Sequence, residues 1–268
     1  MVSVLMSVYF KESPVFFEQA LYSICDQQSF KPSQIVLVKD GRLTPELDDV
    51  IDKFKERLGD VLKIVALPEN VGLGNALNAG LKQCQYELVA RMDTDDVASP
   101  DRLAKQVTFM LSHPEISASS AGLEEYTEDL SRKIGERLLP ADPKALRKFS
   151  KVRSPLSHPV SIYRKSDVLS VGGYPPLRKA QDYGLWSLLL VNGYNLANLP
   201  DVLLKMRTGD GLLERRGWEY FKQEIKLLKF QKDIGFLECH SYCCNILLKG
   251  VLRLSPNFIK RLAYRCAR

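Results

Sequence analysis

The sequence predicts an α/β fold with a mixed, mainly parallel central sheet flanked by helices. The chief observation is that short apolar runs and helical patterns alternate four times within the first ~110 residues, as in parallel, Rossmann-like sheets with right-handed crossovers. A hydrophobic share of 45% in 268 residues is enough for a buried core. In addition, no apolar run approaches the ~20 residues that a membrane-spanning helix needs.

Each predicted element follows from its local pattern. The apolar runs that predict strands lie at residues 3–9, 34–39, 62–67 and 87–92. Helices are expected to begin at Ser13-Pro14, at Thr44-Pro45 and after the glycine-containing turn at 70–74. A Ser or Thr followed by Pro is a typical helix start, because Pro is pre-organised for the first helical position. A further helix is expected from about Pro100.

The loops after these strands carry an aromatic ring and several carboxylates. Tyr9, Asp40 and Asn70 lie in such loops, and three aspartates within residues 93–96 follow the fourth strand. The carboxyl ends of parallel strands share one edge of a sheet, where open α/β sheets bind ligands. A ring and a carboxylate suit a nucleobase, whereas carboxylates this close repel each other unless a cation lies among them. We therefore expect a nucleotide with Mg²⁺ or Mn²⁺ at this edge.

Each of these features also has an ordinary structural explanation. The aspartates could form a solvated turn before a helix, Asp40-Gly41 is a common turn pair, and Tyr9 could pack on the next helix. The glycines of the 70–74 turn could receive a phosphate or ribose, but they lack the GxGxxG spacing of dinucleotide-binding proteins. The shared location of these residues is what favours a binding site.

Taken in order, the motifs resemble those of a family 2 glycosyltransferase with a GT-A fold. The residues that carry the resemblance are Tyr9, VKDG at 38–41, Asn70, Gly72, Asn78, MDTDD at 92–96, GGY at 172–174 and QDYGLW at 181–186. The resemblance covers residues 1 to about 210 and is closest to bacterial transferases that build O-antigens, capsules and exopolysaccharides. There is no QxxRW motif, which argues against a processive polysaccharide synthase.

The resemblance implies a donor site and a metal site. The residues expected to hold a UDP-sugar are Tyr9, Asp40, Asn70, Asn78 and Asp93. Asp95 and Asp96 are expected to hold Mn²⁺ or Mg²⁺ on the diphosphate. Two positions depart from the family: Leu77 replaces a basic residue that many members carry, and Gln181 replaces the Glu of a Glu-Asp pair.

Asp182 is the predicted catalytic base. It precedes an apolar helical run, so the helix N-terminus should hold it beside the cleft and lower its pKa. A carboxylate opposite the departing UDP could take the proton of the acceptor hydroxyl in a single displacement with inversion. The alternative is a carboxylate that only caps its helix. The predicted reaction transfers a hexose, with glucose or galactose favoured, to a sugar hydroxyl of a lipid-diphosphate-linked glycan in O-antigen or capsule biosynthesis.

Five further residues are candidates for contacts with the acceptor or a diphosphate: His158, Trp186, Arg207, Arg215 and Arg216. The forked donors of the arginines suit a diphosphate. The alternatives are a structural histidine, a tryptophan packed in the core and a solvated basic face.

The chain is expected to divide into a transferase domain at residues 1–210 and a helical extension at 211–268. Residues 1–97 would bind the nucleotide sugar and residues 98–210 the acceptor. From Cys239 onward there are six basic residues and no acidic one, in two amphipathic pieces divided by Pro256. This pattern predicts a peripheral protein on the anionic, cytoplasmic face of a bacterial inner membrane. The alternative is a helix packed on the domain with a basic solvent side.

Other functions fit the sequence less well. Residues 93–97 match the DxDx(T/V) motif of haloacid-dehalogenase-like phosphatases, but three strand–helix units precede the motif here, whereas that family places it after the first strand. A non-catalytic nucleotide-sugar-binding or membrane protein is a second alternative. The basic tail lacks an RNA-binding motif, so no nucleic-acid partner is expected. The cysteines have no paired metal spacing and there is no signal peptide, which predicts a cytoplasmic protein.

Overall fold

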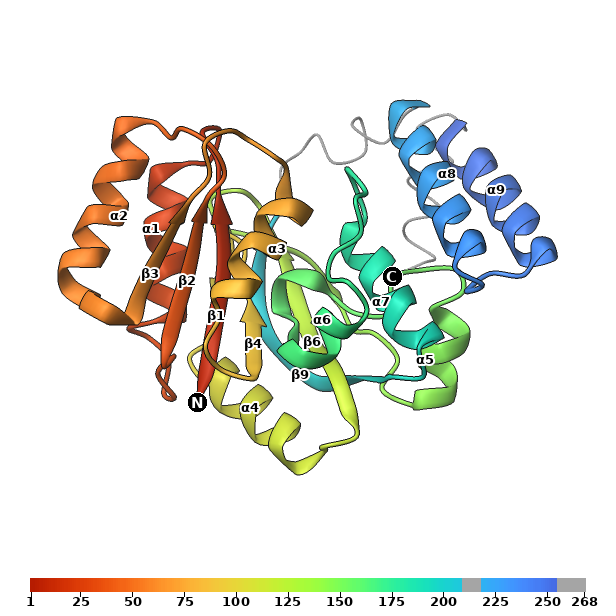
Figure 1. The fold of residues 1–268 in the computed structure, drawn as a ribbon, viewed down its shortest axis with the longest axis horizontal. Coiled ribbons are helices and arrows are strands. Elements are labelled where there is room, and N and C mark those ends of the chain that lie inside the picture. Colours follow the sequence, from red (N-terminus) through yellow and green to blue (C-terminus); the bar gives the residue numbers. More distant parts are fainter. Residues whose placement is uncertain (209–217, 255–268) are drawn as a thin grey trace.

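A nine-stranded sheet runs through the described part of the computed structural model, which comprises residues 1–208 and 218–254 (Figure 1). The strand order is β3-β2-β1-β4-β8-β6-β9-β5, with β7 paired to β6. The mixed α/β fold expected from the sequence is confirmed.

The first half of the chain forms the parallel part of the sheet. Its strands are β1 (Val2–Val8), β2 (Gln34–Lys39), β3 (Leu62–Ala66) and β4 (Leu88–Arg91), all mutually parallel where they pair. The connecting helices are α1 (Pro14–Ile24), α2 (Pro45–Leu58) and α3 (Leu73–Gln83), with a 3-10 turn, η1 (Gly59–Val61), after α2. The side chain of Ser13 caps α1 as expected, by accepting from the backbone N–H of Phe16 at 3.5 Å.

The strands are buried on both faces, so they read as continuous apolar runs. On one face, alternate residues of β1 such as Val4 and Met6 pack with α1, α2 and α4 (Arg102–Ser112). On the other face, Leu5 packs with α3 and α7 (Gln181–Val191). The loops that follow β1, β2, β3 and β4 therefore meet at one edge of a sheet that is covered on both sides.

The second half adds strands that form the antiparallel pairs of the sheet, although β6 and β9 pair in parallel. Its strands are β5 (Val97–Ala98), β6 (Ile116–Tyr126), β7 (Lys133–Arg137), β8 (Ile162–Arg164) and β9 (Asn195–Arg207). β8 lies antiparallel between β4 and β6, which joins the two halves into one sheet. The remaining short helices are α5 (Pro143–Phe149), η2 (His158–Val160) and α6 (Lys165–Ser170). The expected boundary between the nucleotide-sugar-binding half at residues 1–97 and the acceptor-binding half at residues 98–210 falls inside β5.

Two antiparallel helices close the described chain, at the upper right of Figure 1. They are α8 (Trp218–Asp233) and α9 (Cys239–Leu254), and α8 lies between α7 and α9. Leu227, Leu228 and Phe236 from this region join the core that contains α7, so the hairpin packs on the domain. The division expected at residues 210 and 211 lies outside the described residues. Among the described helices, none combines the length and apolarity needed to cross a bilayer.

Candidate active site

The first wall of the site is the turn that follows β3, held by Asp40 at the end of β2. The two carboxylate oxygens of Asp40 accept backbone N–H groups, from Val71 at 2.7 Å and from Gly72 at 3.1 Å. The side chain of Asn70 donates to the backbone oxygen of Asp40 at 3.2 Å. Gly41 permits this close approach, because a Cβ there would come within 2.7 Å of the Asn70 backbone. The predicted nucleotide-binding residues Asp40 and Asn70 are therefore neighbours in a fixed turn.

Tyr9 lies on the same edge, directly after β1. Its ring is 37% exposed and meets Phe10 edge-on at 5.9 Å between ring centroids. Because β1 pairs with β2, the loops that carry Tyr9 and Asp40 are adjacent. An exposed ring beside a carboxylate can stack on a base while the carboxylate accepts from it.

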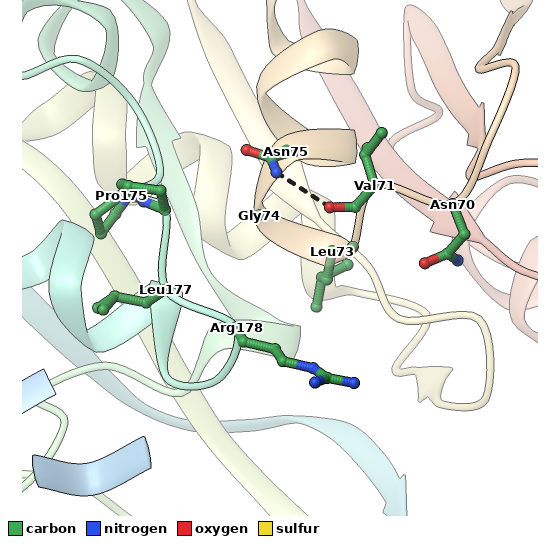
Figure 2. Close-up of a pocket in the computed structure, with 10 residues that line it drawn as sticks. Asn70, Val71, Leu73, Gly74, Asn75, Pro175, Leu177 and Arg178 are labelled. Carbon is green, nitrogen blue, oxygen red and sulfur yellow. Dashed lines mark hydrogen bonds between the residues drawn. The ribbon is translucent and has the colours of Figure 1, made fainter. Parts of the chain in front are cut away.

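A cavity of about 380 Å³ opens between the turn at residues 70–75 and the loop at residues 175–178 (Figure 2). Asn70, Leu73 and Asn75 line one side, and Pro175 and Arg178 line the other. Arg178 extends from its loop towards the turn in Figure 2, is exposed, and forms no hydrogen bond or ion pair within the described residues. Arg178 was not predicted from the sequence, because its loop has no motif spacing.

The acidic cluster, defined as Asp93, Asp95 and Asp96, follows β4. Asp93 pairs with Arg91, whose side chain is only 1% exposed at the end of β4. Asp96 accepts the backbone N–H of Arg207 at 3.1 Å. The two loops that carry the cluster and Arg207 are held together because β5 pairs with β9.

Two carboxylates of the acidic cluster, those of Asp95 and Asp96, resist ionisation. Burial, followed by the charge of Asp93, raises the pKa of Asp95 to about 6. The same causes, with the charge of Asp95 added, raise the pKa of Asp96 well above its usual range. Buried like charges at short range have this effect unless a cation neutralises them.

Glu12 is a fourth carboxylate beside the acidic cluster that the sequence analysis missed. Burial, together with the charges of Asp95 and Asp93, raises its pKa to about 7, although a hydrogen bond with Thr94 opposes the shift. Glu12 follows the end of β1 by four residues and is brought back by a turn in which its N–H donates to Tyr9 at 3.1 Å. The position of Glu12 in a loop after a strand is the sequence feature that could have indicated it as a site residue.

Asp182 lies in the first turn of α7, as expected. Its pKa is sensitive to the charges of Asp93 and Arg91, which places it within electrostatic reach of the acidic cluster. The predicted lowering of its pKa is wrong. Burial raises the pKa to about 6 and outweighs the backbone N–H groups of Asp182 and Tyr183, which act in the opposite direction. At neutral pH the carboxylate is still largely ionised, but it is a stronger base than the sequence suggested.

The loop that carries Asp182 is fixed by α3. The side-chain amide of Asn78 accepts the backbone N–H of Tyr174 and donates to its carbonyl, both at 2.8 Å. Gly74 lets the loop approach α3, because a Cβ at that position would lie 3.3 Å from the side chain of Gln181. Ala180, just before α7, has a left-handed backbone with φ of 58°. The hydrogen bonds of Asn78 thus position the loop in this structure. Backbone strain such as that of Ala180 commonly occurs at functional sites.

Two of the predicted contact residues are in the core. Trp186 is fully buried, and His158 is 8% exposed with its Nε2 3.0 Å from the hydroxyl of Tyr174. Burial lowers the pKa of His158 to about 3, so its ring is neutral. Leu77, which stands where many family members have a basic residue, is also fully buried. These placements match the structural alternatives for His158 and Trp186.

The guanidinium of Arg207 is engaged by the protein itself. It donates to the backbone oxygen of Asp95, to Glu128 at 2.9 Å and to Gln19, and it lies 4.3 Å from the ring centroid of Phe16. Arg207 therefore joins the loop of the acidic cluster to α1. Arg215 and Arg216 lie outside the described residues.

The donor set of the acidic cluster suits a hard divalent cation. Mg²⁺ and Mn²⁺ prefer oxygen ligands, and such ions often take only one or two protein carboxylates with substrate phosphates completing the shell. The described residues contain no group of three or more acidic, His or Cys side chains arranged to hold a metal ion. The raised pKa values of Asp95 and Asp96 show two crowded carboxylates that a cation would relieve.

Comparison with known proteins agrees with these features. The family model described as glycosyl transferase family 2 matches residues 3–169. The chain is 38% identical to the amylovoran biosynthesis glycosyltransferase AmsE of Erwinia amylovora, with 98% of each chain covered. It is 34% identical to the UDP-Gal:alpha-D-GlcNAc-diphosphoundecaprenol beta-1,3-galactosyltransferase of Escherichia coli, covering 98% of this chain and 94% of that one.

Solved structures share the fold. S. aureus TarS 1-349 in complex with UDP-GlcNAc matches with a TM-score of 0.69 at 19% identity, over 96% of this chain and 74% of that chain. Mannosyltransferase PcManGT from Pyrobaculum calidifontis, in complex with GDP-Man and Mn²⁺, matches with a TM-score of 0.66 at 21% identity, over 93% and 68% of the two chains. The fold is therefore GT-A, and the phosphatase alternative falls away. The chain belongs to glycosyl transferase family 2 and is a glycosyltransferase.

Proposed function

We propose that the protein is an inverting, metal-dependent hexosyltransferase. It would move glucose or galactose from a UDP-sugar to a sugar hydroxyl of a lipid-diphosphate-linked glycan in bacterial O-antigen or capsule biosynthesis. The observation that carries this proposal is the position of Asp182, whose pKa is raised chiefly by burial and also by the charge of Asp93. A carboxylate from the second half of the chain lies within electrostatic reach of the acidic cluster, at the edge where the nucleotide-sugar loops end.

The donor would lie along the edge formed by the loops after β1, β2, β3 and β4. Tyr9 is exposed for stacking on uracil, and Asp40 and Asn70 stand beside it. Asp93, oriented by its ion pair with Arg91, is placed to accept from a ribose or sugar hydroxyl. Asp95 and Asp96 would hold Mn²⁺ or Mg²⁺. When bound, the ion would neutralise negative charge that develops on the UDP leaving group.

Asp182 would remove the proton from the attacking hydroxyl. Burial has raised its pKa to about 6, closer to neutrality than that of an ordinary aspartate, which improves proton transfer at working pH. Asn78, Gly74 and the left-handed Ala180 fix the loop that presents it, so its position is set before the substrate binds. Attack from the side opposite UDP, with a single base, gives inversion at the anomeric carbon. The transition state would be oxocarbenium-like.

The cavity between residues 70–75 and 175–178 is the proposed entry of the acceptor. It borders the loop that leads to Asp182, and Arg178 offers it an exposed guanidinium. A guanidinium fork suits the diphosphate of a lipid-linked glycan. The galactosyltransferase of Escherichia coli, which is named for UDP-Gal and a GlcNAc-diphosphoundecaprenol acceptor, supports both substrate classes. Such an acceptor would place the protein at the cytoplasmic face of the inner membrane.

A transfer assay tests this proposal. Purified protein would be supplied with Mn²⁺, a short-chain GlcNAc- or GalNAc-diphosphate-lipid analogue and a panel of UDP- and GDP-sugars, and products would be identified by mass and NMR. We expect a β-linked hexose from UDP-glucose or UDP-galactose, and no transfer after chelation with EDTA. Transfer only from GDP-sugars, or full activity in EDTA, would contradict it.

A further inference from the structure

Helix α9 presents an apolar stripe to solvent. Leu247, Leu248 and Val251 are 69%, 56% and 68% exposed, and Cys243 and Cys244, one turn earlier, are exposed thiols. Residues three and four apart share a helix face, so these five residues form a continuous stripe over more than two turns. We refer to them as the α9 stripe.

The opposite side of α9 faces α8 and carries the charges. Glu224 of α8 accepts from Lys249 at 3.2 Å and from Arg253 at 2.8 Å. Asn245, on the same side, donates to the backbone oxygen of Lys151 at 3.0 Å. The helix therefore turns its cations inward and its leucines outward. The expected alternative of a helix packed on the domain is therefore confirmed for α9, but its basic solvent side is not, because Lys249 and Arg253 face α8.

No comparable stripe occurs elsewhere in the described residues. Other strongly exposed apolar side chains, such as Val15, Leu111 and Leu138, lie on different elements. Trp218, at the start of α8, is 54% exposed and 5.7 Å from the ring of Phe221. Because the Phe221 ring lies 3.3 Å from where a Cβ at Gly250 would be, Trp218 lies near the C-terminal end of α9. Aromatic rings with a polar tip favour membrane–water interfaces.

We propose that the α9 stripe is a lipid-binding face that seats the enzyme on an anionic membrane. Scattered apolar residues are ordinary on a protein surface, but a contiguous exposed patch indicates a contact. Residues 255–268, which follow α9 in the sequence, contain four basic residues and no acidic one, which complements anionic lipid. A second copy docked through the same helix would instead bring two cationic segments together. In Figure 1, α9 forms the outer right edge, beyond α8.

This inference rests on the proposed function only for the reason why the enzyme would bind a membrane. Membrane binding itself can be measured without sugar transfer. The full-length protein would be floated with phosphatidylcholine vesicles, with and without phosphatidylglycerol. The test variant is Leu247→Gln with Leu248→Gln. The matched control is Leu111→Gln with Leu138→Gln, since these leucines are 67% and 56% exposed against 69% and 56% in α9.

We expect the wild type and the control to float with anionic vesicles and to float less with neutral ones. Partitioning of the α9 variant onto anionic vesicles should be at least about tenfold weaker, because two leucine side chains are no longer there to move from water into lipid. Equal flotation of all three proteins would overturn the proposal. So would a wild type that floats with neither vesicle, or a wild-type dimer by light scattering that the α9 variant converts to a monomer.

Turnover separates this inference from the proposed function. The α9 variant should transfer sugar to a short-chain, water-soluble acceptor as fast as the wild type, and lose rate only with an acceptor embedded in vesicles. Vesicle binding by a wild type that transfers to neither acceptor would leave the lipid-binding face standing and remove the proposed function. Equal loss of rate on both acceptors would show that the substitutions damage the enzyme itself, and would overturn the assignment of a face that acts through lipid.

Discussion

Two groups of carboxylates at the same edge of the sheet are held in opposite ways. The oxygens of Asp40 accept backbone N–H groups from Val71 and Gly72, so the charge of Asp40 is compensated by the protein itself. In the acidic cluster, burial and mutual repulsion raise the pKa of Asp95 to about 6 and that of Asp96 well above its usual range. In the proposed function, the nucleoside end of the site would thus be complete before the substrate arrives, whereas the diphosphate end would need a cation.

Asp182 resembles the second group rather than the first. Its pKa is raised to about 6, chiefly by burial, although it sits at a helix N-terminus. A carboxylate that is left partly uncompensated is reactive towards a proton or a cation, whereas a carboxylate saturated with hydrogen bonds is a structural anchor. We therefore propose that this difference separates the residues that would react or bind metal from a residue that shapes the pocket.

Substitution of the base should give the largest effect. Asp182→Asn should lower kcat by about 10²- to 10⁴-fold, because the acceptor hydroxyl loses its base, while UDP affinity is retained. Stopped assays of transfer, together with fluorescence titration of UDP, measure the two quantities separately. A variant that keeps more than about a tenth of wild-type kcat would show that another group takes the proton.

The pH profile should reflect the raised pKa of Asp182. Since the carboxylate must be ionised to act, kcat/KM should fall about tenfold for each pH unit below about 6. The measurement is made at saturating Mn²⁺, so that the acidic cluster stays ionised. An acid limb near pH 4 would mean that the helix N-terminus, and not burial, governs Asp182.

Substitution of Arg178, in the cavity beside the loop that leads to Asp182, should have a smaller effect that is limited to the acceptor. Arg178→Gln should raise KM for a lipid-diphosphate acceptor by about tenfold, the cost of one charged hydrogen bond, and leave KM for the UDP-sugar unchanged. Lys179→Gln is the matched control, because Lys179 is the adjacent cation but lies over the ring of Tyr220 at 5.3 Å. Equal effects of the two substitutions would remove the specific role of Arg178.

The smallest expected effect is that of pH on the thermal stability of the metal-free protein. Asp95 and Asp96 have raised pKa values in the folded state, so the folded protein binds more protons than the unfolded chain between about pH 4 and pH 6. Stability should therefore fall as pH rises through this window, by several degrees in Tm at roughly 2–4 °C per kcal/mol. Scanning calorimetry should show a smaller fall for Asp95→Asn with Asp96→Asn, and for the wild type with Mn²⁺. A Tm that rises through the window by the same amount in all three samples would refute the crowding of this cluster.

The parallel half of the fold could be predicted because its elements are locally consistent. The strand expected at residues 34–39 is β2 (Gln34–Lys39), and Ser13 caps α1 where the Ser-Pro pair indicated a start. β6 (Ile116–Tyr126) was not expected, because Ser117, Ser119, Ser120 and Glu125 make it read as polar although all four are buried. Ser120 hydrogen bonds to Asn198 at 2.5 Å, and Glu125 pairs with Arg137. These partners are distant in sequence, so no local pattern reveals them.

The site was predictable in position but not in electrostatics. Loop positions after strands located Asp40 and the acidic cluster, and a helix start located Asp182. Burial by both halves of the chain raises the pKa of Asp182, whereas its position at a helix start had predicted a lowered pKa. Glu12 was missed because a tight turn returns it to the cluster.

UDP affinity with and without Mn²⁺ tests the contrast between the two carboxylate groups most directly. In the wild type, Mn²⁺ should tighten UDP binding by about tenfold or more, equivalent to at least ~1.4 kcal/mol. Asp95→Asn with Asp96→Asn should lose this gain and keep the metal-free affinity, whereas Asp40→Asn should bind UDP more weakly in both conditions and keep the gain. A gain from Mn²⁺ that survives in the double variant, or that vanishes in Asp40→Asn, would contradict the division of the site into a preformed nucleoside end and a cation-dependent diphosphate end.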